Sequence, residues 1–371
     1  RGLLMLQLTN LPMPDVAGKT VVSLAGLGTA LPPYELSQTM AKSYAKALLG
    51  PRYTHFDRLA PAFENAGVDM RYLVKPVKWY EQDHSWSERG SAYLESAPGL
   101  FINAARAALS DAGVAAEDVD VIVTVSSTGI ATPSLEAQAF KAMGFRNDVQ
   151  RVPVFGLGCA GGVSGLSLAA RLAASRPGQT VLMVTVEACS LSFRTDRLQK
   201  ADIIATVLFG DGAAAAVLRS GSAAMAGRIT LGEGQEHLWP DTLAIMGWDV
   251  DDNGLGVVFD RSIPGFVESN FREAILAMLD RADLTLEDVD RFVCHPGGAK
   301  VLEAIEATMG LAPGSLEAER DTLRAQGNMS APTALFVLDR VLKSGQTGQL
   351  ALCALGPGFT ASMLPLTVAP S

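Results

Sequence analysis

Charge, cysteine and histidine are all scarce in this chain of 371 residues. Only 19% of the residues are charged, the net charge is −9, and Lys and Arg form no stripe, which argues against a nucleic-acid partner. No apolar run reaches the roughly 18–20 residues of a membrane span, so we expect no transmembrane segment. No stretch reads as low complexity or as disordered.

The few cysteines and histidines show no pattern of a disulfide framework or a metal site. Cys159, Cys189, Cys294 and Cys353 have no CxxC spacing, and three of them sit in strand-like apolar runs. We therefore expect reduced thiols in a cytoplasmic protein. The four histidines lack the HxxxH or HxH spacing of a metal centre.

Apolar residues, by contrast, make up 48% of the chain, and an internal repeat organises them. The run Glu117-Asp118-Val119-Asp120 recurs 170 positions later as Glu287-Asp288-Val289-Asp290. The same offset relates Gly178, Gln179 and Leu182 to Gly348, Gln349 and Leu352. One shift kept over about 75 residues indicates a duplicated α/β unit.

Each copy of the unit is expected to hold a helix, a buried strand, a small-residue helix and a second strand. The predicted strands are 119–125 and 180–186 in the first copy, and 289–295 and 349–355 in the second. Apolar strands that alternate with helices predict an α/β fold with a mostly parallel sheet, covered on both faces. We expect two halves, residues 1–225 and 226–371, that share one core.

Three short segments set a reactive or hydrogen-bonding side chain among small residues. They are Gly158-Cys159-Ala160-Gly161-Gly162, His295-Pro296-Gly297-Gly298 and Gly327-Asn328-Met329-Ser330. The repeat offset carries Cys159 onto Met329, the neighbour of Asn328, so both segments begin equivalent helices, and His295 ends an equivalent strand. Ligand sites in such sheets lie outside the carboxyl ends of strands, next to helix N-termini. We therefore expect the three side chains to converge at the centre of the molecule.

The setting of Cys159 is that of a nucleophile. A cysteine at a helix N-terminus faces unpaired backbone N–H groups and the positive end of the helix dipole, which favours the thiolate. The small neighbours of Cys159 leave room for a bulky thioester. The alternative, a buried structural cysteine, remains our interpretation of Cys189, Cys294 and Cys353, which lack this setting.

His295 and Asn328 supply the groups that such a nucleophile needs. His295 can pair with the thiolate and protonate or polarise a carbonyl, and Asn328 adds an N–H donor that cannot titrate. The alternatives are a turn-capping histidine and a helix N-cap asparagine. The three groups together suit decarboxylative condensation, in which the thiolate takes an acyl group and the enolate of a decarboxylated malonyl thioester attacks it. This chemistry requires no metal or redox cofactor.

These motifs resemble those of the type III polyketide synthases, the chalcone synthase-like family of the thiolase fold, and in particular bacterial members. The resemblance covers nearly the whole chain and includes Phe209-Gly210-Asp211-Gly212, Ile263-Pro264-Gly265 and Leu355-Gly356-Pro357-Gly358-Phe359. It implies a duplicated thiolase-like αβαβα fold and a Cys-His-Asn triad at Cys159, His295 and Asn328. It further implies a homodimer that uses malonyl-CoA and an acyl-CoA starter, and a product such as an alkylpyrone, a resorcinol or a phloroglucinol.

The resemblance also assigns substrate-binding residues. They are Phe209, Phe259, Thr132, Cys189, Ser192, Ser330, Gly297, Gly298 and Arg58. Phe209 and Phe259 match the gatekeepers between the CoA tunnel and the reaction cavity. Cys189 and Ser192 stand where plant members of the family have a threonine-rich cavity wall. Thr132 stands where plant members have a methionine that reaches into the partner's cavity. These small residues favour an aliphatic starter. Arg58 matches a CoA-phosphate residue, and an ordinary solvated surface charge is the alternative reading.

Two other functions remain open at the level of sequence. One is a carrier-protein-dependent condensing enzyme like ketoacyl-carrier-protein synthase III, which a basic docking patch would favour; this acidic chain offers none. The other is a non-catalytic scaffold of the thiolase fold, which would be expected to lose the cysteine or the histidine.

Overall fold

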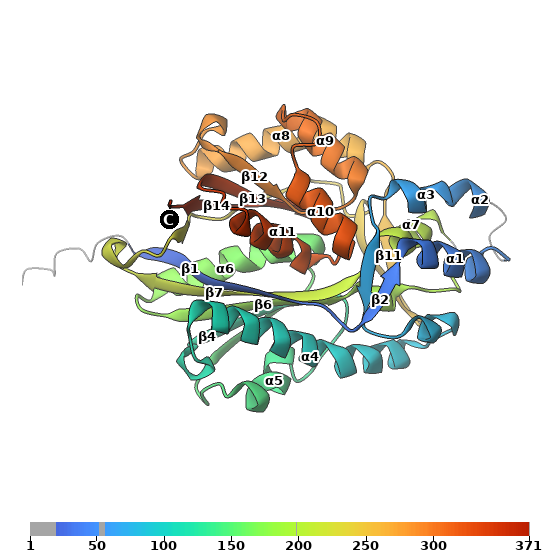
Figure 1. Ribbon diagram of the computed structural model, residues 1–371, viewed down its shortest axis with the longest axis horizontal. Helices are drawn as coiled ribbons and strands as arrows, with labels where there is room; N and C mark the ends of the chain where they lie inside the picture. The colour runs from blue at the N-terminus through green and yellow to red at the C-terminus, as the bar shows by residue number, and fades with distance from the viewer. Residues whose placement is uncertain (1–19, 52–55, 198, 371) are drawn as a thin grey trace, which may run out of the picture.

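A computed structural model of the chain describes residues 20–51, 56–197 and 199–370. The chain folds into five layers, helix–sheet–helix–sheet–helix, which run from bottom to top in Figure 1. The helices of the layers are α4 (Trp86–Ala112) and α5 (Leu135–Met143) at the bottom, α6 (Gly161–Ser175) and α11 (Ala331–Lys343) in the middle, and α8 (Ile263–Arg281) and α9 (Ala299–Met309) at the top. The duplicated α/β arrangement predicted from the repeat is thereby confirmed.

Ten strands form one continuous sheet that passes through both β layers. In spatial order they are β12 (Arg291–Cys294), β13 (Gly348–Gly356), β14 (Thr360–Val368), β8 (Ile229–Leu231), β1 (Val21–Ala30), β7 (Asp211–Gly221), β6 (Thr180–Ala188), β4 (Val121–Val125) and β5 (Gln150–Val154), with β9 (Gln235–Leu238) beside β14. The short strand β8 joins the two layers, because it pairs with β1 on one side and with β14 on the other.

The sheet is mixed rather than parallel throughout. The strands of the repeats pair in parallel, β4 with β5 and β6 and β12 with β13, as the alternation of strands and helices predicts. Strands β1, β7, β8 and β14, by contrast, pair antiparallel with their neighbours. Strands β1, β7 and β14 are apolar and mostly buried like the parallel strands, so the sequence does not reveal their direction.

One repeat correspondence is wrong by a single residue. Strands β4 and β12 keep the expected offset, since Val123 and Val293 both face the central core. In the last strand, Leu182 faces the outer cluster around α4 whereas Leu352 faces the central core. The backbone agrees, because Asp120 accepts the N–H of Thr180 and Asp290 accepts the N–H of Gln349. A slip of one residue turns a side chain to the opposite face of a strand.

The central helices α6 and α11 lie closest to each other at their N-termini. A Cβ atom added to Gly162 would lie 2.2 Å from the carbonyl oxygen of Ala331, and one added to Gly161 would lie 3.1 Å from the Ala331 Cβ. Only glycine permits this approach. The two helix starts that carry Cys159 and Asn328 are therefore adjacent, as the repeat predicted.

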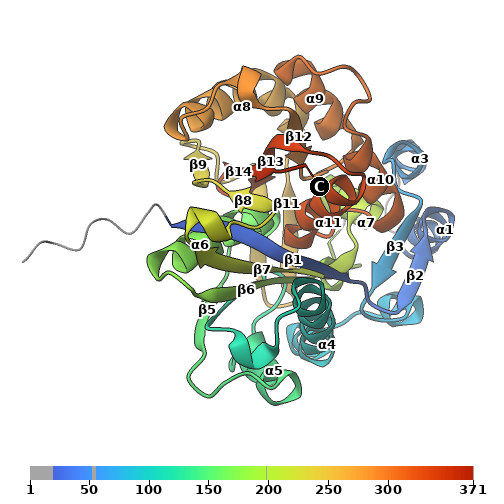
Figure 2. The same cartoon turned by 60° about the vertical axis from the view of Figure 1, so that its left-hand side comes forward.

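The remaining elements cover the carboxyl ends of the strands. At one side (Figure 2) lie α1 (Gln38–Leu49), α2 (Phe56–Leu59), α3 (Pro61–Asn65), α7 (Lys200–Leu208) and α10 (Glu317–Gln326), with a small sheet of β2 (Tyr34–Ser37) and β3 (Met70–Leu73). A separate hairpin pairs β10 (Met246–Asp251) with β11 (Gly254–Phe259). The Ser37 hydroxyl caps α1 by accepting the N–H of Met40.

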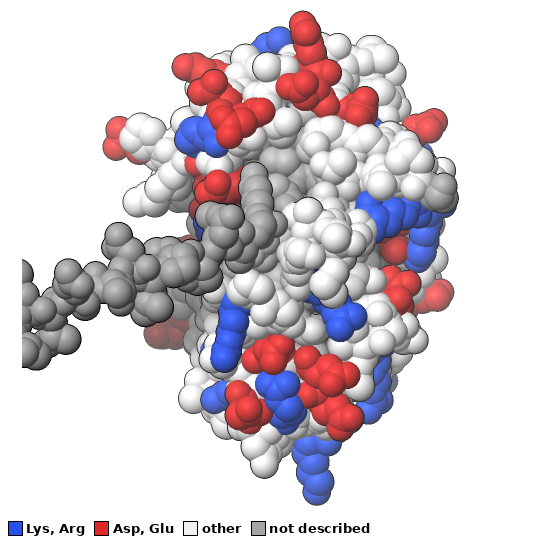
Figure 3. Space-filling model, turned by 90° about the vertical axis from the view of Figure 1, so that its left-hand side faces the viewer, with Lys and Arg blue, Asp and Glu red and all other residues white. Residues whose placement is uncertain are grey.

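The surface carries both signs of charge. On the face shown in Figure 3, acidic and basic side chains are interspersed, and no extended basic surface is visible on that face. Among the described helices, none combines the length and the apolar character that crossing a bilayer requires.

Candidate active site

Cys159 lies in a short 3-10 turn, Gly158–Ala160, immediately before α6. Gly158 has a φ of 49°, and a Cβ there would lie 2.6 Å from the Cδ atom of Pro357, so the turn requires glycine. The side chain of Cys159 is 8% exposed. The nucleophile candidate is thus held at a helix start, at the bottom of a recess.

Burial governs the protonation of this thiol. It raises the pKa of Cys159 to about 11, against a smaller lowering by hydrogen bonds from the side chains of Ser330 and Asn328; the carboxyl of Glu187 also raises it. The expectation that the helix start favours the thiolate is therefore wrong, because desolvation outweighs the helix terminus. Cys159 is a neutral thiol until a base accepts its proton.

His295 follows β12, and its backbone N–H donates to the carbonyl of Cys353 at 2.8 Å. The ring is buried, and neither Nδ1 nor Nε2 has a hydrogen-bond partner among the described residues. Burial lowers the pKa of His295 to about 4. The imidazole is therefore neutral at physiological pH and keeps a free lone pair, which suits a proton acceptor better than a turn cap.

The side-chain amide of Asn328 is oriented by its own turn. Its Oδ1 accepts the N–H of Ser330 at 2.8 Å, and its Nδ2 donates to the carbonyl of Gly297 at 3.3 Å. Asn328 is not the N-cap of α11, because Ser330 occupies that position. Ser330 has a φ of 61° and a ψ of −130°, a strained conformation for a residue other than glycine.

These contacts bring the three predicted segments together. The side chains of Ser330 and Asn328 lower the pKa of the Cys159 thiol, and Asn328 also donates to the loop that begins at His295. The backbone of Asn328 pairs with Phe209 in an isolated bridge, which fixes the start of α11 against the end of α7. The amide of Asn328 thus lies between the turn that carries the thiol and the loop that follows the imidazole.

A recess of about 450 Å³, counting the space open to solvent, adjoins Cys159. It is lined by Ser127, Thr128, Gly158, Cys159, Cys189, Phe209, Met246, Gly247, Trp248, Val257, Val258, Phe259, Ser330 and Pro357. Four of the predicted substrate-binding residues are in this set: Phe209, Phe259, Cys189 and Ser330. Within the described ranges, no group of His, Cys, Asp and Glu side chains could hold a metal ion.

The other predicted substrate-binding residues lie elsewhere. Gly297 and Gly298 form the loop between His295 and α9, where the Gly297 carbonyl receives Asn328. Thr132 is exposed and does not line the recess of its own chain. Arg58 is exposed on α2 and lines neither the recess nor the cavity described next.

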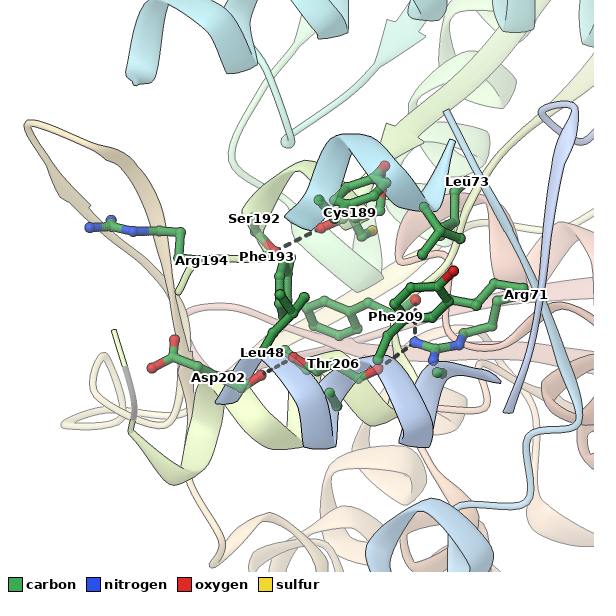
Figure 4. A pocket seen from close by; sticks show the side chains of 18 residues that line it. Leu48, Arg71, Leu73, Cys189, Ser192, Phe193, Arg194, Asp202, Thr206 and Phe209 are labelled. Atoms are coloured by element: carbon green, nitrogen blue, oxygen red, sulfur yellow. Dashed lines mark hydrogen bonds between the residues drawn. The ribbon is translucent and has the colours of Figure 1, made fainter. Parts of the chain in front are cut away.

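A second, apolar cavity of about 680 Å³, counting the space open to solvent, shares Cys189 and Phe209 with the recess. It runs between α1, β3 and α7, and its wall includes Leu36, Ala41, Tyr44, Leu48, Leu73, Ser192 and Phe193. Figure 4 shows Leu48, Leu73, Phe193 and Phe209 gathered around this space, with the guanidinium of Arg194 turned away from it. The side chain of Ser192 donates to the carbonyl of Cys189 at 2.7 Å.

Sequence reasoning missed a buried carboxyl beneath the nucleophile. Glu187 is fully buried near the end of β6, and its carboxylate accepts the N–H of Ser127 and the hydroxyl of Thr128, at 3.0 and 2.6 Å. Burial raises the pKa of Glu187 to about 8. An acidic residue within a nine-residue strand of buried residues was the signal that could have revealed it.

Comparisons with known proteins agree with this architecture. The family model of the chalcone and stilbene synthase N-terminal domain matches residues 74–222, and that of the C-terminal domain matches residues 231–367. The chain is 37% identical to 1,3,6,8-tetrahydroxynaphthalene synthase of Streptomyces peucetius subsp. caesius, over 93% of this chain and 92% of that protein.

Solved structures give the same result. The crystal structure of 1,3,6,8-tetrahydroxynaphthalene synthase from Streptomyces coelicolor superposes with a TM-score of 0.88 at 26% identity, covering 94% of this chain and all of that one. PKS-I of the brown alga Ectocarpus siliculosus superposes with a TM-score of 0.88 at 25% identity, covering 95% of this chain. This chain therefore belongs to the chalcone and stilbene synthase family, the type III polyketide synthases, which are acyltransferases that form carbon–carbon bonds by condensation.

Proposed function

We propose that this chain is an iterative, CoA-dependent polyketide synthase that loads an acyl-CoA starter on Cys159. His295 accepts the thiol proton, the thiolate attacks the starter thioester, and CoA leaves as a thiol. Malonyl-CoA then loses CO₂, and the side chains of Asn328 and His295 stabilise the enolate oxygen. The enolate carbon attacks the acyl carbonyl on Cys159, the Cys159 thiolate leaves, and the extended chain is then a CoA thioester. This thioester reloads Cys159, with release of CoA, and the cycle repeats before the product cyclises.

One observation carries this mechanism. The imidazole of His295 is buried, neutral and without a partner among the described residues, and the thiol of Cys159 is held in its protonated form by burial. A base with a free lone pair and a neutral nucleophile are the two groups required to generate the thiolate when substrate binds. The oriented amide of Asn328 supplies the second hydrogen bond for an oxyanion.

Two single variants test these roles. Cys159→Ala should abolish acyl loading, measured as the mass of the intact protein after incubation with an acyl-CoA. Cys353→Ala, which removes another buried thiol behind the site, should load normally and serves as the control. Asn328→Ala should slow malonyl-CoA decarboxylation by about 10²–10³ while loading is less affected. An acyl adduct on the Cys159→Ala protein would overturn the assignment.

We further propose an aliphatic starter. The second cavity shares Cys189 and Phe209 with the recess, and its wall is mostly apolar, which suits a flexible hydrocarbon chain. Two or three malonyl extensions would then give an alkylpyrone or an alkylresorcinol-like ring. The test is kcat/KM with hexanoyl-, lauroyl- and coumaroyl-CoA, in which a preference for coumaroyl-CoA contradicts the proposal. Ser192→Trp should shorten the accepted chain and leave malonyl decarboxylation intact.

A homodimer is also proposed. Among the described strands, β5 stands at the end of the sheet with an unpaired edge, and the large apolar residues Ile130 and Phe155 near it are 64% and 60% exposed. Thr132 lies on the same loop as Ile130 and would approach the partner's cavity. Pairing at such an edge would cover both features. Sedimentation at micromolar concentration should give a dimer, and a monomer would contradict this.

A simple assay distinguishes the proposed function from that of a carrier-protein-dependent condensing enzyme. Purified protein should consume malonyl-CoA and release a polyketide with no carrier protein present. If turnover needs an acyl carrier protein, the rival function holds instead.

A further inference from the structure

One turn of the chain supplies a continuous part of the wall of the second cavity. It consists of the 3-10 turn Cys189–Ser192 and the residue that follows, and we call residues 189–193 the wall turn. Four of its five side chains line the cavity: Cys189, Ser190, Ser192 and Phe193. Figure 4 shows Cys189, Ser192 and Phe193 along one side of the space. The position of the wall turn therefore determines the width that a bound chain finds.

The middle of the wall turn is fixed by Ser190. Its N–H donates to the carboxylate of Asp211 at 2.7 Å, and its hydroxyl donates to the other oxygen of the same carboxylate. The hydroxyl of Tyr80 lies 2.6 Å from the Ser190 hydroxyl. These bonds do not reach the two carbonyl groups further along the turn, those of Leu191 and Phe193.

Arg89 binds those two carbonyl groups. Its Nη1 donates to the carbonyl oxygens of Leu191 and Phe193, at 2.6 and 2.7 Å, and its Nε donates to the carbonyl oxygen of His84 at 3.2 Å. Arg89 is buried near the start of α4 and lines neither the recess nor the second cavity. Because a buried carbonyl without a donor is unfavourable, the conformation of the wall turn depends on this guanidinium.

The contacts of Arg89 call for an arginine rather than for any cation. Two nitrogen atoms of one planar group make three bonds in fixed directions, which a single ammonium nitrogen cannot reproduce. The stem of the side chain is packed as well, since a Cβ atom added to Gly254 would lie 3.2 Å from the Cδ atom of Arg89. The guanidinium is thus held between α4, the β10–β11 hairpin and the wall turn.

We propose that Arg89 is a positioning residue for the starter, which holds the wall turn at the distance from α1 that admits an extended acyl chain. This inference rests on the proposed function, in which the second cavity accommodates the hydrocarbon chain of an acyl-CoA. Arg89 acts through the wall turn and touches no substrate. Malonyl-CoA reacts in the recess at Cys159, to which the wall turn contributes only Cys189, so its decarboxylation should not depend on Arg89.

Arg89→Met tests the proposal, because methionine keeps an apolar stem and removes the donors. The measurement is kcat/KM with hexanoyl-CoA and with lauroyl-CoA, whose longer chain touches more of the cavity wall. The ratio of lauroyl-CoA to hexanoyl-CoA should fall by about tenfold, the discrimination that contact with one methylene group supports. The fall should come mainly from a higher KM for lauroyl-CoA. Decarboxylation of malonyl-CoA by the same protein should keep the wild-type rate.

Arg106→Met is the matched control. Arg106 lies on the same helix, and its Nη2 also donates to a backbone carbonyl, that of Ala142 at 2.9 Å. It is exposed and lies about 25 Å further along the helix, so it does not reach the wall turn. The ratio of lauroyl-CoA to hexanoyl-CoA should stay at its wild-type value in this variant.

The outcomes separate this inference from the function on which it rests. If the wild type makes no polyketide from any acyl-CoA, the proposed function fails. If the wild type is active and a folded Arg89→Met protein keeps the wild-type ratio, this inference alone is overturned. An equal loss with both starters and in malonyl-CoA decarboxylation would also overturn it, because such a loss indicates a general structural role.

Arg89→Lys decides the matter if the methionine variant does not fold. Lysine keeps the charge but cannot bind His84 and both carbonyl groups of the wall turn at once. The ratio of lauroyl-CoA to hexanoyl-CoA should therefore fall in the same direction and by less. An unchanged ratio in a folded Arg89→Lys protein would overturn the proposal.

Discussion

The contact between the central helices predicts a large effect from one methyl group. In Gly162→Ala, the new Cβ would lie 2.2 Å from the carbonyl oxygen of Ala331, at least about 1 Å closer than a normal C···O contact. Neither partner can rotate away, because the oxygen belongs to the backbone at the first turn of α11. Helices α6 and α11 must therefore separate by about 1 Å. Overpacking of this kind costs about 1–3 kcal/mol of unfolding free energy.

The same displacement should act on catalysis. Cys159 precedes α6 and Asn328 precedes α11, so separating the helix starts moves the thiol away from the amide. A misplacement of 1 Å in a reacting geometry costs on the order of 10²-fold in rate. Gly162→Ala should thus lower the rate of malonyl-CoA decarboxylation by about that factor, measured as released CO₂.

Gly99→Ala is the matched control. Gly99 lies in α4, is exposed, and an added Cβ would meet no atom within 4 Å. The change should raise the unfolding free energy by about 0.5–1 kcal/mol, since alanine favours a helix, and leave decarboxylation unchanged. Urea unfolding measures both variants. A Gly162→Ala protein that unfolds at the wild-type midpoint and decarboxylates at the wild-type rate would refute the reasoning.

Two further predictions concern protonation. Alkylation of Cys159 by iodoacetamide should accelerate steadily from about pH 6 to about pH 9, because burial raises the pKa of the thiol to about 11 and leaves His295 uncharged; a plateau below about pH 7 would reveal a thiolate–imidazolium pair instead. Glu187→Gln should gain stability relative to the wild type as pH rises from about 5 to about 8, since burial raises the pKa of Glu187 to about 8 when folded and the unfolded chain ionises near 4.3. A stability difference that stays constant over this range, in urea unfolding at each pH, would contradict that assignment.

The repeat predicted the elements around the site well and the pairing of the last strand poorly. Strands β4, β6, β12 and β13 lie within two residues of their expected bounds. The match of Gly178-Gln179 with Gly348-Gln349 aligned β6 with β13 one residue out of register. Identical residues in a turn do not determine which backbone N–H Asp120 and Asp290 each accept. Direction and register are set by hydrogen bonds that a single sequence does not display.

The active site, too, was predictable from the sequence only in part. Small residues around Cys159, His295 and Asn328 identified the reacting groups, because tight turns leave a mark in the sequence. Burial depth leaves none, and this is why the pKa of Cys159 moves in the opposite direction from the helix-start argument. Trp248 lies in the region 227–270, outside the repeat, where no symmetry pointed to it. The division of the chain at residues 225 and 226 stays a prediction.

Strand β8 shows how the two halves of the duplicated chain depend on each other. The first half alone would leave the edge of β1 open, and the second half alone would leave the outer edge of β8 open, ready to pair with another molecule. Two copies of one half would close each other's edges in this way, and the present chain is in that sense a dimer with a covalent link. Its two equivalent helix starts differ, since Cys159 precedes α6 and Asn328 precedes α11.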